Sequence, residues 1–460
     1  MHSLNWFNIK NYLLRWKFPM TKKHKPNSNA LFKRAIDNMP LGVADSYRYW
    51  GEENTVFLSS MKGCTITDCD EQTFIDFRLA YGPIILGYRD ERVDNAVINA
   101  ITNVGTISGF STGLDSDVVE LVKSLCPNID KMRFSNSGTE AVIGAVRTAR
   151  GFTKRNKIVV VEGGFHGLHD EVMWKSDVDN WDINTEETPA IIPFGGGIPQ
   201  STREHQVSVP LNDFDAIDAV FAKHGGDIAA ILIEPIMGNC GSISSTQAYM
   251  QKLRDVCDGN GSLLIMDEVK TGFRVAKGGV QELYGINADL TTYAKAMGNG
   301  YPVAAFGGRA AVMDAISFDK NGVTHGGTYT ANMVALSAAK ATLTVLKETD
   351  ALATIASVGQ KIQALLARVF TKFGIEHCFA GPDAMFGVHF GSKVPQNYRD
   401  WKQTNSDLYT QFALNLIDNG VMLEPDSREP WFICEAHQTA DLNWLEQVAE
   451  QSMAEAINSH

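Results

Sequence analysis

Three residue patterns in this chain could carry chemistry, and the first contains a lysine. Lys295 stands between the apolar stretch 290–294 (LTTYA) and the glycine-rich turn 297–302 (MGNGYP). Burial disfavours the charged form of an amine, so a partly desolvated Lys295 would be a nucleophile able to form a Schiff base with a carbonyl group. An isolated lysine is usually a solvated surface residue. The interpretation therefore depends on the two patterns upstream.

The second pattern places a carboxylate at the end of an apolar run. Asp267 directly follows 262–266 (SLLIM), which is typical of a buried strand. A carboxylate in that position could pair with a protonated ring nitrogen, which a pyridine-based cofactor needs in order to act as an electron sink. Taken alone, the same aspartate could simply cap the next segment.

The third pattern is 135–141 (SNSGTEA), followed by small apolar residues at helical spacing. The N-terminus of a helix offers unpaired N–H groups and the positive end of a dipole, which suits a phosphate monoester. A simple helix cap would use the same residue types. A lysine, a ring-nitrogen partner and a phosphate cradle on one scaffold nevertheless point to a single kind of cofactor site.

Buried strands alternating with helices would bring these patterns together. The runs 158–161, 229–233 and 262–266 alternate with helical patterns, which predicts parallel βαβ units. Acidic residues follow the three runs: Glu162, Glu234, and the pair Asp267 and Glu268. Ligands of such sheets bind at the carboxyl ends of the strands.

The C-terminal part of the chain has a different character. Amphipathic helices are predicted at 353–370 and 443–457, with short strand-like pieces between them. We therefore expect a smaller α+β domain beside a large doubly wound α/β domain. The expected organisation is an extension (1–20), a segment that contributes to the small domain (21–80), the large cofactor-binding domain (81–345) and the C-terminal small domain (346–460).

Composition excludes several functional classes. The chain has 460 residues and a net charge of −12, which disfavours nucleic-acid binding. Seven cysteines without a CxxC pair favour free thiols in a reducing cytoplasm. The extension is aromatic and basic but is interrupted by polar residues, so it cannot span a bilayer. It is either an interfacial helix or sequence upstream of a natural start at Met20. No integral membrane segment is expected.

The motifs together resemble a known family. SNSGTEA, EGGFHG, IEPIMGN, DEVKTGFR, AKAMGNGYP and GGTYTAN occur in the order seen in class III, fold type I pyridoxal-phosphate aminotransferases. The resemblance runs from about Pro40 to the C-terminus. AYGPIILGY and the stretch 278–309 resemble the glutamate-1-semialdehyde aminomutase branch of that family. It implies pyridoxal 5'-phosphate as cofactor and a homodimer with shared active sites.

The resemblance also implies roles for individual residues. Lys295 would carry the cofactor as a Schiff base, and Asp267 would pair with the pyridine nitrogen. The phosphate would be held by Ser137, Gly138 and Thr139. Further cofactor contacts would come from Phe165, which stacks on the ring, and from His166, Asn239 and Val269, with Thr328 reaching the cofactor of the neighbouring subunit.

Two matches and two departures concern the substrate. Arg48 matches an arginine that binds a substrate carboxylate in the aminomutase branch, and Glu429 matches an acidic residue there. In the aminomutases the stretch that corresponds to 168–197 is a lid rich in glycine, alanine and serine, whereas here it is polar and contains Trp174 and Trp181. The second departure is Lys270, which stands where the aminomutases usually have methionine. These departures favour a two-substrate aminotransferase. Glutamate is the expected donor, because the branch uses five-carbon amino acids and Arg48 could bind a carboxylate.

The identity of the carbonyl acceptor stays open in the sequence. The polar, tryptophan-bearing stretch suits a hydroxylated acceptor, and an oxidised 3-deoxy-octulosonate of lipopolysaccharide biosynthesis is one such molecule. Alternatives are a glutamate-1-semialdehyde 2,1-aminomutase, a general ω-amino-acid transaminase and an inactive interaction protein on the same fold. His166 and His169 have metal-ligand spacing, but no third ligand and no HExxH motif accompany them, and no nucleotide-binding motif occurs. We expect no metal.

Overall fold

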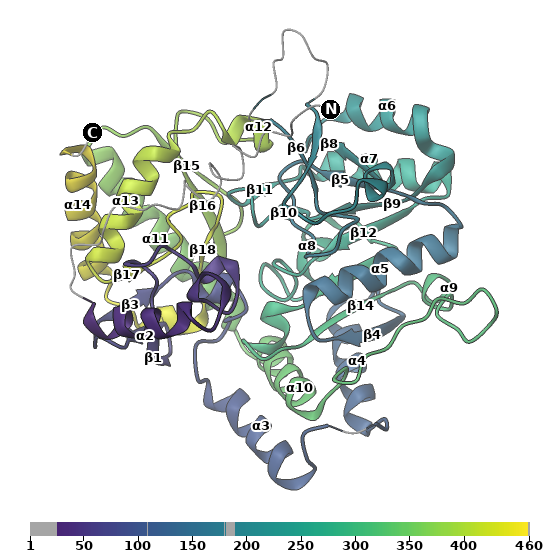
Figure 1. The fold of residues 1–460 in the computed structure, drawn as a ribbon, viewed down its shortest axis with the longest axis horizontal. Helices are drawn as coiled ribbons and strands as arrows, with labels where there is room; N and C mark the ends of the chain where they lie inside the picture. The colour runs from purple at the N-terminus through teal and green to yellow at the C-terminus, as the bar shows by residue number, and fades with distance from the viewer. Residues whose placement is uncertain (1–24, 108, 179, 181–188, 459–460) are drawn as a thin grey trace.

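A seven-stranded sheet forms the centre of one half of the molecule (Figure 1). The computed structural model describes residues 25–107, 109–178, 180 and 189–458. Along the sheet the strands are β4 (Lys131–Ser135), β14 (Ala304–Gly308), β13 (Leu290–Tyr293), β12 (Leu263–Asp267), β9 (Ile228–Ile233), β5 (Lys157–Val161) and β8 (Gln206–Val209). β14 runs antiparallel to both of its neighbours, and the other pairs are parallel. The expected α/β class with a mainly parallel sheet is confirmed.

Helices cover both faces of this sheet. In β5, Val159 and Val161 pack with α6 (Phe214–His224) and α7 (Gln247–Asn260). Ile158 and Val160, the alternate residues, pack with α5 (Gly138–Thr153) on the opposite face. Because side chains alternate along a strand, a strand covered on both faces must be apolar throughout. This is why the central strands appear in the sequence as continuous apolar runs.

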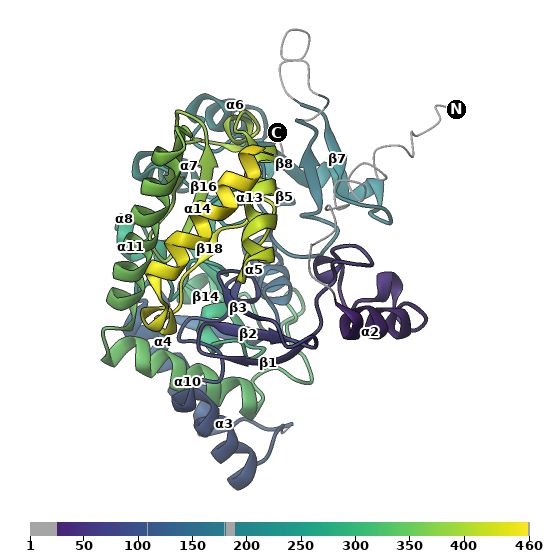
Figure 2. The ribbon, with the colours of Figure 1, turned by 90° about the vertical axis from the view of Figure 1, so that its left-hand side faces the viewer.

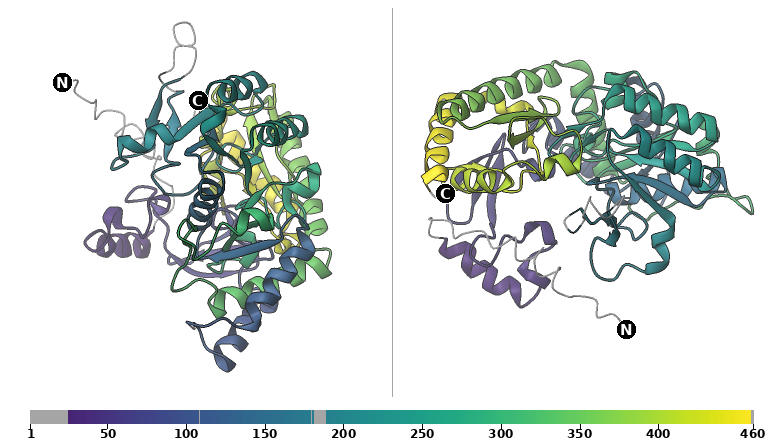
Figure 3. Two further views of the ribbon diagram at one scale, coloured as in Figure 1. Left: turned by 90° about the vertical axis from the view of Figure 1, so that its right-hand side faces the viewer. Right: turned by 90° about the horizontal axis from the view of Figure 1, so that it is seen from above.

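The other half combines both ends of the described chain. Its four-stranded sheet has the order β1 (Leu58–Lys62), β2 (Thr65–Asp68), β3 (Thr73–Asp76) and β17 (Val421–Met422). A three-stranded sheet contains β15 (His377–Ala380), β16 (Met385–Phe390) and β18 (Trp431–Phe432). The helices of this half are α2 (Pro26–Ile36), α11 (Ala351–Lys372), α13 (Ser406–Asp418) and α14 (Leu442–Asn458). Figures 2 and 3 show the yellow C-terminal helices beside the purple N-terminal strands, with α2 at the edge.

Three further helices lie together at one end of the molecule. α3 (Glu91–Asn103) and α4 (Gly113–Leu125) both pack against α10 (Met333–Glu348), as Figure 1 shows below the large sheet. The remaining short elements are α8 (Gly279–Tyr284), α9 (Ala310–Met313), α12 (Tyr398–Trp401), β6 (Trp174–Ser176), β7 (Ile191–Pro193), β10 (Ile236–Met237) and β11 (Ile243–Ser244). Short 3-10 turns connect several of these elements, among them η2 (Ser46–Arg48) and η6 (Lys295–Gly298).

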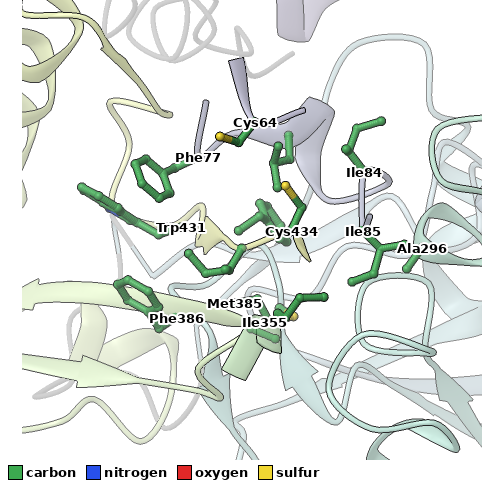
Figure 4. Packing of buried hydrophobic residues seen from close by; sticks show 14 of the residues in the cluster. Cys64, Phe77, Ile84, Ile85, Ala296, Ile355, Met385, Phe386, Trp431 and Cys434 are labelled. Atoms are coloured by element: carbon green, nitrogen blue, oxygen red, sulfur yellow. The ribbon is translucent and has the colours of Figure 1, made fainter. Parts of the chain in front are cut away.

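Polar side chains and apolar packing join the two halves. The fully buried Arg274 donates to the carbonyl oxygens of Ile84 (3.1 Å) and Ile433 (2.8 Å). Asn299 accepts hydrogen bonds from the N–H groups of Ile85 (3.0 Å) and the next residue (2.9 Å). Figure 4 shows Ile84 and Ile85 beside Ala296, the residue after the candidate lysine. The loop that carries this lysine is thereby fixed to the 84–87 segment.

Several expectations about elements are confirmed. The strands predicted at 158–161, 229–233 and 262–266 are β5, β9 and β12, and the two predicted C-terminal helices are α11 and α14. The division into a large and a small domain stays a proposal. Among the described residues, no helix combines the length and the apolar character needed to cross a membrane. The predicted extension, residues 1–20, lies outside the described residues.

Candidate active site

The predicted site residues come from successive strands that end at one edge of the large sheet. β14 is antiparallel to both β4 and β13, so the carboxyl end of β4 lies at the same edge as those of the parallel strands. The residues at or just beyond these ends are Ser137 after β4, Phe165 after β5, Glu234 after β9, Asp267 in β12 and Lys295 after β13. Open α/β sheets bind ligands at this edge.

The N-terminus of α5 forms a tight backbone cradle. The Ser137 hydroxyl caps the helix by accepting a first-turn N–H (3.2 Å), and the amides of Gly138 and Thr139 have no helical acceptor. A Cβ on Gly138 would lie 3.1 Å from a Val269 methyl group. Gly167 has a φ of +92°, and a Cβ there would lie 2.6 Å from the Thr139 hydroxyl oxygen. This geometry suits an anion bound by backbone N–H groups.

Asp267 is held in one orientation by three hydrogen bonds. Its Oδ2 lies 2.8 Å from His166 Nδ1, and its Oδ1 accepts from the Thr292 hydroxyl (2.9 Å) and the Val269 N–H (3.1 Å). The carboxylate is 3% exposed, and a buried charge needs such partners. His166 is also buried, and its Nε2 has no hydrogen-bond partner among the described residues. His166 therefore acts first as a support for Asp267.

Lys295 is strained and has an acidified ammonium group. Its φ is +46°, an uncommon conformation for a residue with a side chain, and it is held between the buried residues Ala294 and Ala296. Burial lowers the pKa of Lys295 to about 7, and the nearby positive charge of Lys270 acts in the same direction. A large fraction of the amine is then neutral near pH 7, which a nucleophile or a base requires.

Phe165 is positioned as a flat wall of the site. Its N–H donates to Glu234 Oε1 (2.9 Å), and its half-buried ring meets the Tyr47 ring edge-on at 6.2 Å. The Phe194 ring lies 6.4 Å away. Glu234 is itself 4% exposed, and burial raises the pKa of its carboxyl. The Glu234 bond fixes the backbone that presents the ring.

A hydrogen-bonded network links Asn239, Glu429 and Lys270. Asn239 Nδ2 donates to Glu429 Oε1 (2.7 Å), and Lys270 Nζ donates to Glu429 Oε2 (3.0 Å). Lys270 also donates to the Gly238 carbonyl oxygen (2.6 Å), and a Cβ on Gly238 would lie 2.0 Å from the lysine side chain. The structure thus brings the predicted residues Asn239 and Glu429 into direct contact and adds Lys270, which the sequence showed only as a departure from the family pattern.

Two other predicted residues lie apart from this cluster. Arg48 has a side chain that is 66% exposed and pairs with Asp45 (2.7 Å). Its ion pair is with Asp45 and not with a residue of the cluster, although it directly follows Tyr47, whose ring contacts Phe165. Thr328 is exposed as well. Exposure of Thr328 is compatible with its predicted contact to a neighbouring subunit, which a single chain does not contain.

The lid-like stretch differs from expectation. Trp174 is 4% exposed in β6, and its indole N–H donates to the Thr202 hydroxyl (2.9 Å). The expectation that the tryptophans of this stretch face a hydroxylated substrate is therefore wrong for Trp174, because its ring is buried. Trp181 lies outside the described residues.

Sequence reasoning missed a buried ion pair near the site. Arg78 Nε donates to Glu424 Oε2 at 3.0 Å, and the Glu424 side chain is 2% exposed. The signal in the sequence was a lone arginine between Phe77 and Leu79, both of which are completely buried. A charged residue inside an apolar run needs a partner.

His166 and His169 both have surroundings that differ from those of metal ligands. Asp267 engages His166 Nδ1, and burial lowers the pKa of His169 to about 4. Among the residues that the structure describes, no group of three or more histidine, cysteine, aspartate or glutamate side chains could hold a metal ion.

The arrangement fits an aromatic ring that carries a phosphate and an aldehyde. The α5 cradle would take the phosphate and Phe165 the ring face, while Asp267 would meet a ring nitrogen and Lys295 the aldehyde. The tight contacts at Gly138 and Gly167 support this fit, because any side chain there would fill the cradle.

Comparisons with known proteins agree with this chemistry. The sequence profile described as "Aminotransferase class-III" matches residues 47–448. A glutamate-1-semialdehyde 2,1-aminomutase of Archaeoglobus fulgidus is 34% identical over 93% of this chain and 99% of its own length. The aminomutase of Methanothermobacter thermautotrophicus is 35% identical with the same coverage. An omega-transaminase structure from Sphaerobacter thermophilus superposes with a TM-score of 0.86 at 27% identity, covering 94% of this chain and 98% of that one.

Proposed function

This chain belongs to the class-III aminotransferase family and uses pyridoxal phosphate, and on that premise we propose a two-substrate aminotransferase with glutamate as donor. The observation that carries the proposal is the placement of two residues at the ends of neighbouring strands. Asp267 is the last residue of β12 and Lys295 follows β13, at the sheet edge where α5 begins. Bound pyridoxal phosphate supplies an aldehyde for the amine and a ring that accepts electron density. The residues of the chain then hold the ring and move protons.

In this proposal Lys295 is the catalytic base and acid. Its neutral amine would take a proton at Nζ from the α-carbon of the donor and deliver it, on the same face, to the former aldehyde carbon of the bound cofactor. Asp267 keeps the ring nitrogen protonated, and the His166 bond holds the carboxylate in the orientation that this requires. Phe165 excludes water from one face of the ring, and Ser137, Gly138 and Thr139 anchor the phosphate.

Glutamate is proposed as donor because Arg48 matches a carboxylate-binding arginine and lies next to Tyr47 at the rim. For the acceptor we propose a hydroxylated aldehyde or ketone, with an oxidised 3-deoxy-octulosonate as the candidate to test. The support is the polar network around Glu429 and Lys270. Seven free cysteines support a cytoplasmic location for the enzyme.

We also propose that two copies of the chain share their active sites. α3 exposes Ile98 (57%) and Ile101 (45%), and beyond its C-terminal end Val104 is 67% exposed and Phe110 is 88% exposed. Apolar side chains gathered in this way are typical of an interface. Tyr329, the neighbour of Thr328, is 66% exposed, so the segment proposed to reach the second cofactor is on the surface.

The second candidate function is an aminomutase, because curated relatives that are 33–36% identical carry that name. One experiment separates the two. Glutamate is added to the pure enzyme while the visible absorbance of the lysine-bound cofactor is followed. Aldehydes are then tested for their ability to restore this absorbance. We expect glutamate to remove the absorbance with release of 2-oxoglutarate. Rapid conversion of glutamate semialdehyde to 5-aminolevulinate without any donor would establish the aminomutase instead.

A further inference from the structure

Arg78 and Glu424 are brought together by the pairing of two distant strands. β3 and β17 are parallel, with Met422 opposite Asp76. Arg78 and Glu424 therefore each stand two residues beyond a paired position, at the same end of the small sheet. The ion pair is a product of this register, since 346 positions separate the two residues in the chain.

The pair is rigidly held. Arg78 Nε donates to Glu424 Oε2 (3.0 Å), and its Nη2 donates to the Tyr47 carbonyl oxygen (2.7 Å). The Tyr81 hydroxyl donates to Glu424 Oε2 (3.1 Å). The guanidinium carbon lies 4.1 Å from the centre of the Tyr81 ring and 4.9 Å from that of Trp50. These contacts fix a polar group between aromatic faces.

One donor and one acceptor in this pair are unused. Glu424 Oε1 is buried and has no hydrogen-bond partner among the described residues. Arg78 Nη1 makes no hydrogen bond within the same part of the chain. A buried carboxylate oxygen without a partner is costly, so it signals a ligand or a water that completes the site.

The pair adjoins the candidate active site. Tyr47, which accepts from Arg78, meets the Phe165 ring edge-on at 6.2 Å. The charge of Glu429 acts on Glu424, and the same charge acts on Lys295. When the carbonyl carbon of a substrate lies at Lys295, the rest of the substrate therefore lies near the Arg78–Glu424 pair.

Charge decides which chemical group suits this position. When Glu424 is ionised, it neutralises Arg78 as Glu429 neutralises Lys270, so the wall then has no net charge to attract a carboxylate or an ammonium. Burial raises the pKa of Glu424 to about 7, against the opposing effect of Arg78. A hydroxyl can both donate and accept, so it satisfies either protonation state of Glu424 as well as the free N–H of Arg78.

We propose that Arg78 and Glu424 form a subsite that binds a hydroxyl group on the carbon chain of the carbonyl acceptor. This inference rests on the proposed function, in which the site takes such an acceptor. It makes the enzyme selective for hydroxylated over deoxygenated molecules of equal length. The other reading is that an ordered water and a structural ion pair account for the unused groups.

The test compares two ligands that differ only in hydroxyl groups. D-ribonate and 5-hydroxypentanoate share chain length, carboxylate and terminal hydroxyl. Calorimetry on the cofactor-loaded enzyme should show that ribonate binds more tightly by about ten- to hundredfold, the range for hydrogen bonds to charged groups. Equal affinities, or no binding of ribonate, would overturn the subsite. This comparison needs no variant.

Variants locate the effect. Glu424→Gln and Arg78→Lys should each bring the ratio of the two affinities close to one. Glu446→Gln, which breaks the Arg368–Glu446 pair between α11 and α14, is the matched control and should leave the ratio unchanged. A ratio that survives both site variants would also refute the proposal. The glutamate half-reaction is recorded on the same preparations, so that failure of the proposed function is seen separately from failure of the subsite.

Discussion

Replacing Lys270 by methionine should raise the pKa of Lys295. The pKa of Lys295 is lowered from an ordinary 10.5 to about 7, first by burial and second by Lys270. The charge of Lys270 lowers this pKa because protonation of Lys295 would place two cations close together. Methionine keeps the aliphatic stem over Gly238 but removes the charge. At an effective dielectric constant of about 20, two like unit charges several ångströms apart repel by about 2 kcal/mol. Since 1.36 kcal/mol corresponds to one pH unit, we expect a rise of about 1 to 2 pH units.

The rate at which the cofactor-free enzyme captures pyridoxal phosphate reports this pKa. Only the neutral amine of Lys295 reacts, so the rate should increase with pH and pass its midpoint near pH 7 in the unaltered enzyme. In Lys270→Met the midpoint should move to higher pH. Lys252→Met, which removes an α7 lysine that is paired with Asp218 of α6, is the control. A midpoint in Lys270→Met that is unchanged, or lower, would refute the electrostatic argument; thermal unfolding of each variant detects a loss of fold.

Other substitutions test the remaining parts of the site. Asp267→Asn should keep the fold and lower the turnover rate at least about a hundredfold, and a near-normal rate would assign the ring nitrogen to another residue. Gly138→Val should weaken cofactor retention, measured by dialysis, because a Cβ at this position would lie 3.1 Å from a Val269 methyl group and the rest of the side chain would fill the cradle; full retention would place the phosphate elsewhere. Thr328→Ala should loosen cofactor binding in the dimer, and mixing it with Lys295→Ala should redistribute the defects among heterodimers. Unchanged affinity in Thr328→Ala would contradict the shared site.

The sequence predicts best what depends on neighbouring residues. The strands β5, β9 and β12 are buried on both faces, so their continuous apolar runs were recognisable, and so was the acidic residue that ends β12. The Ser137 cap was also recognisable, because a helix cap depends only on the residues next to it in the sequence. The order of the family motifs supplied the expectation that Lys295 and Asp267 belong to one site.

Contacts between distant segments could not be predicted in this way. β17 has two residues, too few for a periodic pattern, yet its pairing with β3 brings Glu424 to Arg78. Lys270 looked only like a substitution, because its partner Glu429 lies 159 positions further along the chain. Trp174 was misread since a tryptophan in a polar stretch gives no indication of which element will cover it.

The central claim, that Lys295 carries the cofactor, has a direct test. Borohydride makes the bond between lysine and cofactor permanent, and mass spectrometry of a digest then locates the phosphopyridoxyl group. We predict the group on the peptide that contains Lys295. Lys270 offers a sharp alternative, because it is 5% exposed and its charge acts on Lys295. Finding the group on Lys270, or on any lysine other than Lys295, would contradict the account.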